Sequence, residues 1–157
     1  KVVLKSPYKL KVNANLKKDG KLLLAIENRY DYAQFFGIRD PHSNLLLTSF
    51  LPRFMSNIIS TLILKRPYVN YLYSFREIKK MLMDTGFKNV ELYMAFPHYH
   101  APELLLPYEG GITRYRKYWA YKNLSFKQSL LHLAQYIMMK YFRLRFFAPS
   151  IIAIAKK

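Results

Sequence analysis

The sequence predicts an α/β domain in which short apolar strands alternate with amphipathic helices. Three stretches carry this prediction. An apolar run at residues 21–26 follows a turn, a helix with clear start and stop signals at residues 75–85 leads into a second apolar run, and a third apolar run at residues 151–155 closes the chain. Because these runs are short and are flanked by turn residues, they are better explained as buried strands than as helices.

The first strand begins after a Lys-Lys-Asp-Gly turn at residues 17–20. The chain becomes abruptly polar at Glu27, Asn28 and Arg29, as expected at the carboxyl end of a buried strand. We therefore assign residues 14–30 to a turn and a strand.

A long excursion follows at residues 31–71, with Asp40-Pro41-His42 marking a loop. Four apolar residues within it recur at helical spacing: Phe54, Ile58, Ile59 and Leu62. This periodicity predicts one amphipathic helix, so the excursion is interpreted as a helical insertion.

Residues 73–96 contain the clearest local signal. Ser74 and Glu77 stand three positions apart, as in a capping box, where each side chain bonds the other residue's backbone N–H. Gly86 supplies the left-handed position that ends many helices. The spacing predicts a helix from residue 75 to about residue 85, followed by a strand at residues 90–96.

Residues 112–157 are predicted to form a basic helical segment and a last strand. Ser125 can cap a long helix that ends near Arg145, because Pro149 disfavours helical backbone just before it. One face of this helix is expected to gather Leu130, Ala134, Ile137, Met138 and Tyr141. No internal repeat or domain boundary interrupts the sequence, so residues 1–157 are treated as a single domain.

The charge of the chain is strongly positive and unevenly placed. Lys and Arg number 26 against 9 acidic residues, a formal net charge of +17. No acidic residue follows Glu109, whereas ten cations lie from Arg114 to Lys157. Such a field attracts polyanions, so this tail is a candidate binding surface for nucleic acid or an anionic membrane. The alternative is that its aromatic residues pack inside while the cations are solvated.

The chain contains no cysteine, which excludes disulfides, thiolate metal sites and cysteine nucleophiles. This absence fits a reducing compartment, and we expect a cytoplasmic location, with peripheral association to a membrane as a variant. The longest apolar stretch, residues 44–64, is broken by Pro52 and Arg53. It is unsuited to spanning a bilayer but could lie on its surface.

The order of these elements resembles the C-terminal part of class I, Rossmann-like S-adenosylmethionine-dependent methyltransferases. The Lys-Lys-Asp-Gly turn and its strand are similar to the turn and fifth strand of that family. Tyr-Ser-Phe-Arg-Glu-Ile at residues 73–78, with Asp-Thr-Gly-Phe at residues 84–87, resembles the signature of the last crossover helix before the sixth strand. Residues 148–157 resemble the antiparallel seventh strand. Glu27-Asn28-Arg29, Gly37 and Asp40-Pro41-His42 further resemble a bacterial subgroup linked to surface-polysaccharide synthesis.

The resemblance implies a partial Rossmann-like methyltransferase sheet with an inserted helical segment. It also implies S-adenosylmethionine as cofactor and methyl transfer to a small-molecule or glycan acceptor by a full-length parent. The family binds its cofactor on a glycine-rich loop, yet no Gly-x-Gly occurs here, so the cofactor-binding residues stay unknown. Residues 1–15 would be the remnant of a fourth strand and its helix, and an exposed sheet edge could favour self-association. An inactive truncated fragment is a further alternative.

The resemblance places Glu27, Asn28 and Arg29 at the acceptor side, where they either face the acceptor or anchor the loop. Asp40 and His42 are candidates for a catalytic base, although Asp40-Pro41 is equally an ordinary turn.

His98 and Tyr99 lie just after the sixth strand and are candidates for substrate contact, the alternative being an ordinary surface loop. His98 and His100 lie on one side of an extended chain. No third ligand stands at a recognisable spacing, so no metal site is expected.

Overall fold

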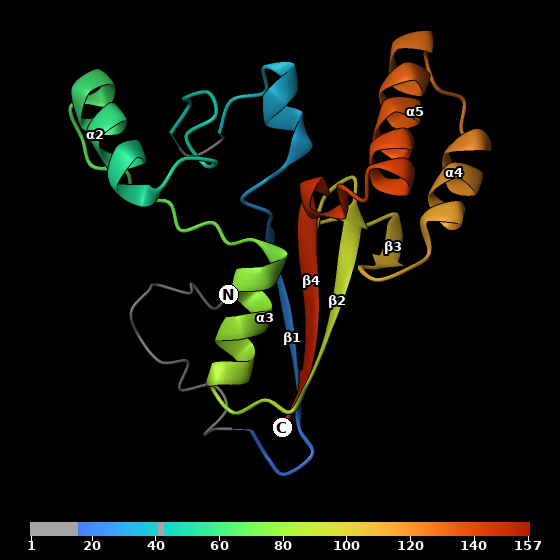
Figure 1. Ribbon diagram of the computed structural model, residues 1–157, viewed down its shortest axis with the longest axis horizontal. Coiled ribbons are helices and arrows are strands. Elements are labelled where there is room, and N and C mark those ends of the chain that lie inside the picture. Colours follow the sequence, from blue (N-terminus) through green and yellow to red (C-terminus); the bar gives the residue numbers. More distant parts are fainter. Residues whose placement is uncertain (1–15, 41–42) are drawn as a thin grey trace.

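A four-stranded sheet organises the fold in the computed structural model, which describes residues 16–40 and 43–157 (Figure 1). Its strands are β1 (Lys21–Glu27), β2 (Asn89–Phe96), β3 (Leu104–Pro107) and β4 (Ser150–Lys156), in the spatial order β1-β4-β2-β3. Each pairing among these four strands is antiparallel. Because β1 and β2 both run antiparallel to β4, they are parallel to each other, and the last strand of the chain lies between them.

Four α-helices complete the mixed α/β structure, and two short 3-10 helices lie between strands and helices: one between β1 and α2, the other between α5 and β4. The α-helices are α2 (Arg53–Leu64), α3 (Phe75–Asp84), α4 (Ile112–Ala120) and α5 (Phe126–Tyr141), and the 3-10 helices are η1 (Tyr32–Phe36) and η2 (Arg145–Phe147). The mixed α/β class and the three predicted strands are confirmed. Strand β3 and helix η1 were not predicted.

The register of β4 aligns its two neighbours residue for residue. Lys156 pairs with Lys21 of β1 and with Asn89 of β2, and Ser150 pairs with the last residue of β1 and with Ala95 of β2. The carboxyl ends of β1 and β2 therefore meet at the same edge of the sheet, on either side of Ser150.

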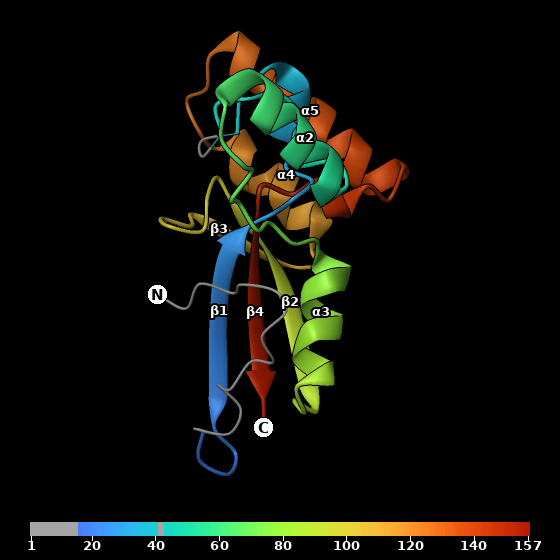
Figure 2. The same cartoon turned by 90° about the vertical axis from the view of Figure 1, so that its left-hand side faces the viewer.

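Helix α3 covers one face of the sheet (Figure 2). Ser74 Oγ accepts a hydrogen bond from the backbone N–H of Glu77, while the Glu77 carboxylate accepts one from the Ser74 N–H at 2.7 Å, so the predicted capping box is present. The helix buries one apolar side against the sheet, and Gly86 adopts a φ of +93° as its C-terminal signal requires. Its fully buried residues are Phe75, Ile78 and Leu82.

The opposite face of the sheet mixes apolar and charged residues and is less completely covered. Leu23 of β1 pairs with Ile154 of β4, so the two side chains share a face. Leu23 is 68% exposed, and Ile154 is half-buried. Alternating strand geometry places the residues that meet α3 on the other side. Within the described ranges, this second face of β1 carries apolar surface that remains accessible.

Helices α4 and α5 pack against each other near the carboxyl end of β2. Tyr115 of α4 is fully buried and its ring meets that of Phe96 at 4.9 Å. Helix α5 begins with a capping box formed by Ser125 and Gln128. It ends at Tyr141 and not near Arg145, because the backbone adopts left-handed geometry at Arg143, where φ is +56°. The proposed remnant of a fourth strand in residues 1–15 lies outside the described residues.

Helix α2 forms within residues 31–71, where the apolar periodicity predicted a helix, but it stands apart from the sheet (Figures 1 and 2). It lies at the end of the molecule toward which β1 points, as do η1 and α5. Because no strand or other helix packs extensively on α2, its contacts come mainly from the loops around it.

Candidate functional site

The carboxyl edge of the sheet brings two sequence-predicted residues together. Glu27, the last residue of β1, pairs with Ser150, and the backbone N–H of Tyr99 donates a hydrogen bond to Ser150 Oγ at 3.2 Å. The charge of Glu27 also contributes to a raised Tyr99 pKa, after the larger effect of burial. Open α/β sheets bind ligands beyond the carboxyl ends of their parallel strands, and this is such an edge.

Asp31 adds a second carboxyl group to this edge. Its Oδ1 accepts a hydrogen bond from the N–H of Ala33 at 2.9 Å and so caps η1. Burial raises the pKa of Asp31 from its ordinary 3.8 to about 6, the hydrogen bond from Ala33 opposes the shift, and the charge of Glu27 adds to it. A carboxyl group whose pKa is raised toward neutral pH is frequently found at a functional site. The sequence showed an Asp at a helix start but not its burial, so this residue was not among the predicted ones.

Two phenols interact electrostatically with the two carboxyl groups. Burial, followed by the charge of Asp31, raises the pKa of Tyr32 to about 12. Tyr99 is the second phenol, and the charge of Glu27 contributes to its raised pKa. We call Glu27, Asp31, Tyr32 and Tyr99 the carboxylate cluster. With Asp31 ionised above pH 6 and both phenols protonated, the cluster can accept a proton from a ligand and donate hydrogen bonds to it.

Asn28 follows Glu27 of the carboxylate cluster, but its side chain makes hydrogen bonds to backbone groups within the protein. It is 1% exposed, and its Nδ2 donates hydrogen bonds of 2.6 Å to the carbonyls of Phe146 and Ala148. Its Oδ1 accepts a hydrogen bond from the N–H of Tyr30 at 3.2 Å. These bonds join the end of β1 to the entry of β4, the loop-anchoring role that was the alternative to acceptor contact.

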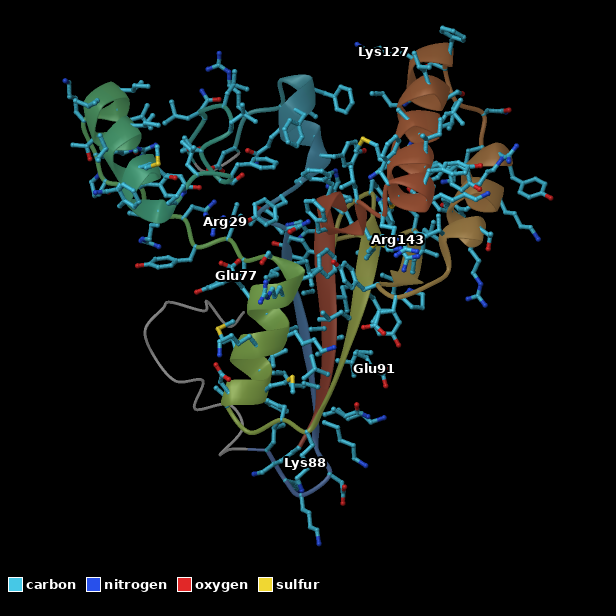
Figure 3. All side chains as sticks on the ribbon, viewed as in Figure 1. Arg29, Glu77, Lys88, Glu91, Lys127 and Arg143 are labelled. Atoms are coloured by element: carbon cyan, nitrogen blue, oxygen red, sulfur yellow. The ribbon has the colours of Figure 1, made fainter. Side chains whose placement is uncertain are left out.

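Arg29 also joins segments of the chain. Its guanidinium donates to the carbonyl of Ser49 at 2.8 Å and to that of Leu51 at 2.6 Å. A 3.3 Å ion pair connects it to Glu77, the capping residue of α3, and Figure 3 shows the two side chains pointing toward each other. Arg29 thereby fixes the entrance of α2 relative to α3.

Asp40 belongs to a separate cluster within the insertion. It is fully buried, and its carboxylate accepts hydrogen bonds from the hydroxyls of Ser43 at 2.9 Å and Tyr68 at 3.0 Å. Asn70 donates to its other oxygen at 3.4 Å. Burial, followed by the charge of Asp40, raises the pKa of Tyr68. The arrangement ties the two ends of the loop around α2 together. His42, proposed as its catalytic partner, lies outside the described residues.

His98 is exposed on the loop after β2, and the rings of Tyr99 and His100 are 3.9 Å apart. Among residues 16–40 and 43–157, no three His, Cys, Asp or Glu side chains gather as a metal site requires. Nothing in the geometry joins His98 to the carboxylate cluster beyond its position next to Tyr99.

The basic tail uses part of its charge internally. Lys122 forms an ion pair with Glu103, which also accepts a hydrogen bond from Tyr118. The guanidinium of Arg116 and the ammonium of Lys140 lie over the ring of Tyr136 at 5.8 Å and 5.3 Å. These contacts favour the view that much of the tail packs on itself, and binding of an anionic surface through residues 114–157 stays a prediction.

Several hollows in the described part of the chain lie outside the carboxylate cluster, and two of them are of substantial volume. The larger, about 470 Å³, runs between α3 and the outer edge of β2, and its polar lining includes Arg76, Lys79, Glu91 and Glu109. The smaller, about 220 Å³, lies between α4 and α5 beside the stacked rings of Trp119 and His132, whose centroids are 3.8 Å apart. Neither hollow is lined by a residue of the carboxylate cluster.

Comparison with family models, with curated proteins and with solved structures found no match. In the described part of the chain, no helix combines the length and the apolar character needed to cross a membrane.

Proposed function

We propose that this chain forms the acceptor-side half of a class I S-adenosylmethionine-dependent methyltransferase that acts on a small-molecule or glycan acceptor. One observation carries the proposal. β1 and β2 are parallel, the capped helix α3 precedes β2, and β4 runs antiparallel between the two strands. Two parallel strands, a last crossover helix and an antiparallel final strand are the elements that the sequence resemblance implies for the end of that fold.

The free edge of β1 supports the same proposal. Among the described residues, β1 pairs only with β4, and five consecutive apolar residues make up its centre. An edge strand of this kind invites pairing with another strand. Leu23, on the face away from α3, also leaves apolar surface exposed, whereas sheets of open α/β folds are covered on both faces. Further strands beside β1 and a further helical layer would bury both surfaces.

The described residues do not fit the cofactor by themselves. Their glycines contain no Gly-x-Gly, so the backbone cannot approach a nucleotide as the family loop does. The cofactor, which supplies an electrophilic methyl group when bound, is therefore assigned to the part of the fold that precedes β1.

The carboxylate cluster is the acceptor site of this proposal. Asp31 is ionised at neutral pH but retains a pKa of about 6, so it can take the proton from an acceptor hydroxyl as that oxygen becomes nucleophilic. Glu27 keeps the site negative, and the protonated Tyr32 and Tyr99 can donate hydrogen bonds that orient the acceptor. Positioning at the strand ends would provide most of the rate effect. Under this proposal Asp31 replaces Asp40 as the favoured base, because Asp40 is fully buried and engaged by Ser43 and Tyr68.

Calorimetric titration of S-adenosylmethionine tests the proposal. The titration is run on the 157-residue chain and on the complete product of its gene, with adenosine as a control ligand that lacks the sulfonium. We expect micromolar binding by the complete product and at least about tenfold weaker binding by the chain alone. A complete product that is folded and monodisperse but binds no S-adenosylmethionine would overturn the proposal.

A further inference from the structure

Helix α2 is inverted relative to an ordinary surface helix. Its buried residues are Ser56 and Ser60, which are 1% and 2% exposed. Its apolar residues face outward: Phe54, Met55, Ile58, Leu62 and Ile63, each between 39% and 66% exposed. At 100° per residue, Ile63 lies beside Ser56, whereas the other four, Phe54, Met55, Ile58 and Leu62, occupy the side opposite the two serines. We call these four the α2 apolar face.

Hydrogen bonds on the serine side fix this orientation. Ser56 Oγ donates to the carbonyl of Thr48 at 2.6 Å, and Ser60 Oγ donates to the carbonyl of Arg66 at 2.9 Å. Both bonds are directional contacts to loop backbone; the bond of Ser56 is buried and that of Ser60 is partly buried. Rotating the helix to bury the α2 apolar face would break these bonds and leave two carbonyls unpaired.

Among the described residues, nothing packs on the α2 apolar face. Packing of the apolar side therefore does not stabilise this helix. Most helical stability in proteins comes from packing of the apolar side, and an isolated helix of this length is marginal in water. Here the polar side packs, and the α2 apolar face points away from the loops.

The charge around α2 selects the chemistry of the partner. No acidic residue occurs from residue 43 to residue 71, whereas Arg53, Lys65 and Arg66 flank the helix. Lys65 and Arg66 are exposed at its C-terminal end, and Arg53 stacks on the ring of Tyr71 at 3.3 Å. Exposed apolar side chains bordered only by cations complement a surface that combines hydrocarbon with negative charge.

We propose that the α2 apolar face binds the surface of an anionic lipid bilayer. The helix lies in the plane of the interface, with Phe54, Ile58 and Leu62 at the boundary of the acyl chains and Lys65 and Arg66 at the lipid phosphates. This attachment is independent of methyl transfer. Where both proposals hold, it brings the carboxylate cluster to a membrane surface, because Arg29 links the entrance of α2 to the end of β1.

Vesicle co-sedimentation tests this inference. The protein is mixed with vesicles of phosphatidylcholine alone and of phosphatidylcholine with phosphatidylglycerol, and the bound fraction is measured. We expect binding to the anionic vesicles and a loss of about tenfold or more on combining Ile58→Glu with Leu62→Glu. These two side chains are exposed, so the protein should remain folded, which circular dichroism checks.

Helix α5 offers a matched comparison, because it belongs to the other candidate anionic-surface contact, residues 114–157. Leu130 and Leu133 are 56% and 50% exposed, again on a helix surface. We expect the pair Leu130→Glu and Leu133→Glu to retain binding within about twofold. The pair Lys65→Glu and Arg66→Glu should reduce binding most at low salt, because screening weakens the charge contribution.

Three results would overturn the inference. One is a wild-type protein that does not bind anionic vesicles. Another is an equal loss of binding in the α5 pair, which would assign the contact to residues 114–157 as much as to α2. The third is a wild-type dimer in light scattering that becomes monomeric in the Ile58→Glu and Leu62→Glu pair, which would make a second copy the occupant of the face.

Discussion

Helices α2 and α3 are both predicted from the spacing of their apolar residues, and they direct their apolar sides oppositely. α3 buries Ile78 and Leu82 completely against the sheet. α2 exposes Ile58 and Leu62 and buries two serines instead. The periodicity of apolar residues identifies a helix in both cases, but the partner of the apolar side depends on which surfaces the rest of the fold presents. α3 contributes to the stability of this domain, whereas the outward side of α2 is free to serve binding.

The largest expected effect tests this contrast directly with one substitution in each helix. Ile78→Ala leaves a cavity between α3 and the sheet, and we expect it to lower the free energy of unfolding by about 2–5 kcal/mol. Ile58→Ala removes the same atoms from an exposed position and should change it by no more than about 0.5 kcal/mol. Urea denaturation of both variants measures the difference. A similar loss in the two variants would mean that α2 is buried in solution.

The second prediction contrasts Asp31 of the carboxylate cluster with Asp40, the buried carboxylate of the insertion. The pKa of Asp31 is about 6 in the folded chain and near 3.8 when it is exposed. Between these values the folded state binds more protons than the unfolded state, so this residue lowers stability progressively as pH rises from about 4 to 6, and the loss is complete above pH 6. Asp31→Asn keeps an oxygen acceptor for the N–H of Ala33. We expect it to raise the free energy of unfolding at pH 7 by up to about 3 kcal/mol.

The measurement is urea denaturation at several pH values. The variant should lose the stability difference at pH 4 and show it fully at pH 7. Asp40→Asn is the control, because the amide keeps one oxygen for Ser43 and Tyr68 but turns its NH2 group toward the donor of Asn70, which should destabilise the protein. A destabilising Asp31→Asn at pH 7 would contradict the burial of an ionisable group at the strand edge.

The contrast also explains how far the sequence could predict this fold. The capping box of α3 and the apolar runs of β1, β2 and β4 are local features, and each was found. β3 has four residues and little periodicity, so local pattern could not distinguish it from a loop. The end of α5 was predicted too late in the sequence. The left-handed backbone that ends the helix occurs at Arg143, and no glycine there indicates it.

The candidate site was less accessible to sequence reasoning than the fold. The polar residues after β1 could be recognised as a strand end, which places Glu27 correctly. Whether a polar side chain faces a ligand or another loop depends on contacts across the chain, such as those of Asn28 with residues 146 and 148. The importance of Asp31 comes from its burial, which no local pattern shows.

A smaller effect tests what holds α2 in its inverted orientation. Ser56→Ala removes a buried donor and leaves the carbonyl of Thr48 unpaired. We expect a loss of about 1–2 kcal/mol, measured by urea denaturation. Ser60→Ala should have a similar effect through the carbonyl of Arg66. If both substitutions were neutral, the serine side would not determine which face of α2 meets solvent.

The smallest expected difference lies between two capping boxes of the same design. Ser74 begins α3, whose apolar side is buried, and Ser125 begins α5, whose first turns are exposed. We expect Ser74→Ala to lower the free energy of unfolding by about 1 kcal/mol and Ser125→Ala by about 0.5 kcal/mol. The reason is that α3 unfolds with the sheet, whereas the start of α5 can fray while the core remains intact. Hydrogen exchange of the N–H groups of Glu77 and Gln128 separates the cases: Ser125→Ala should increase exchange only near Gln128, and an increase spread over the whole sheet would show that α5 unfolds together with the core.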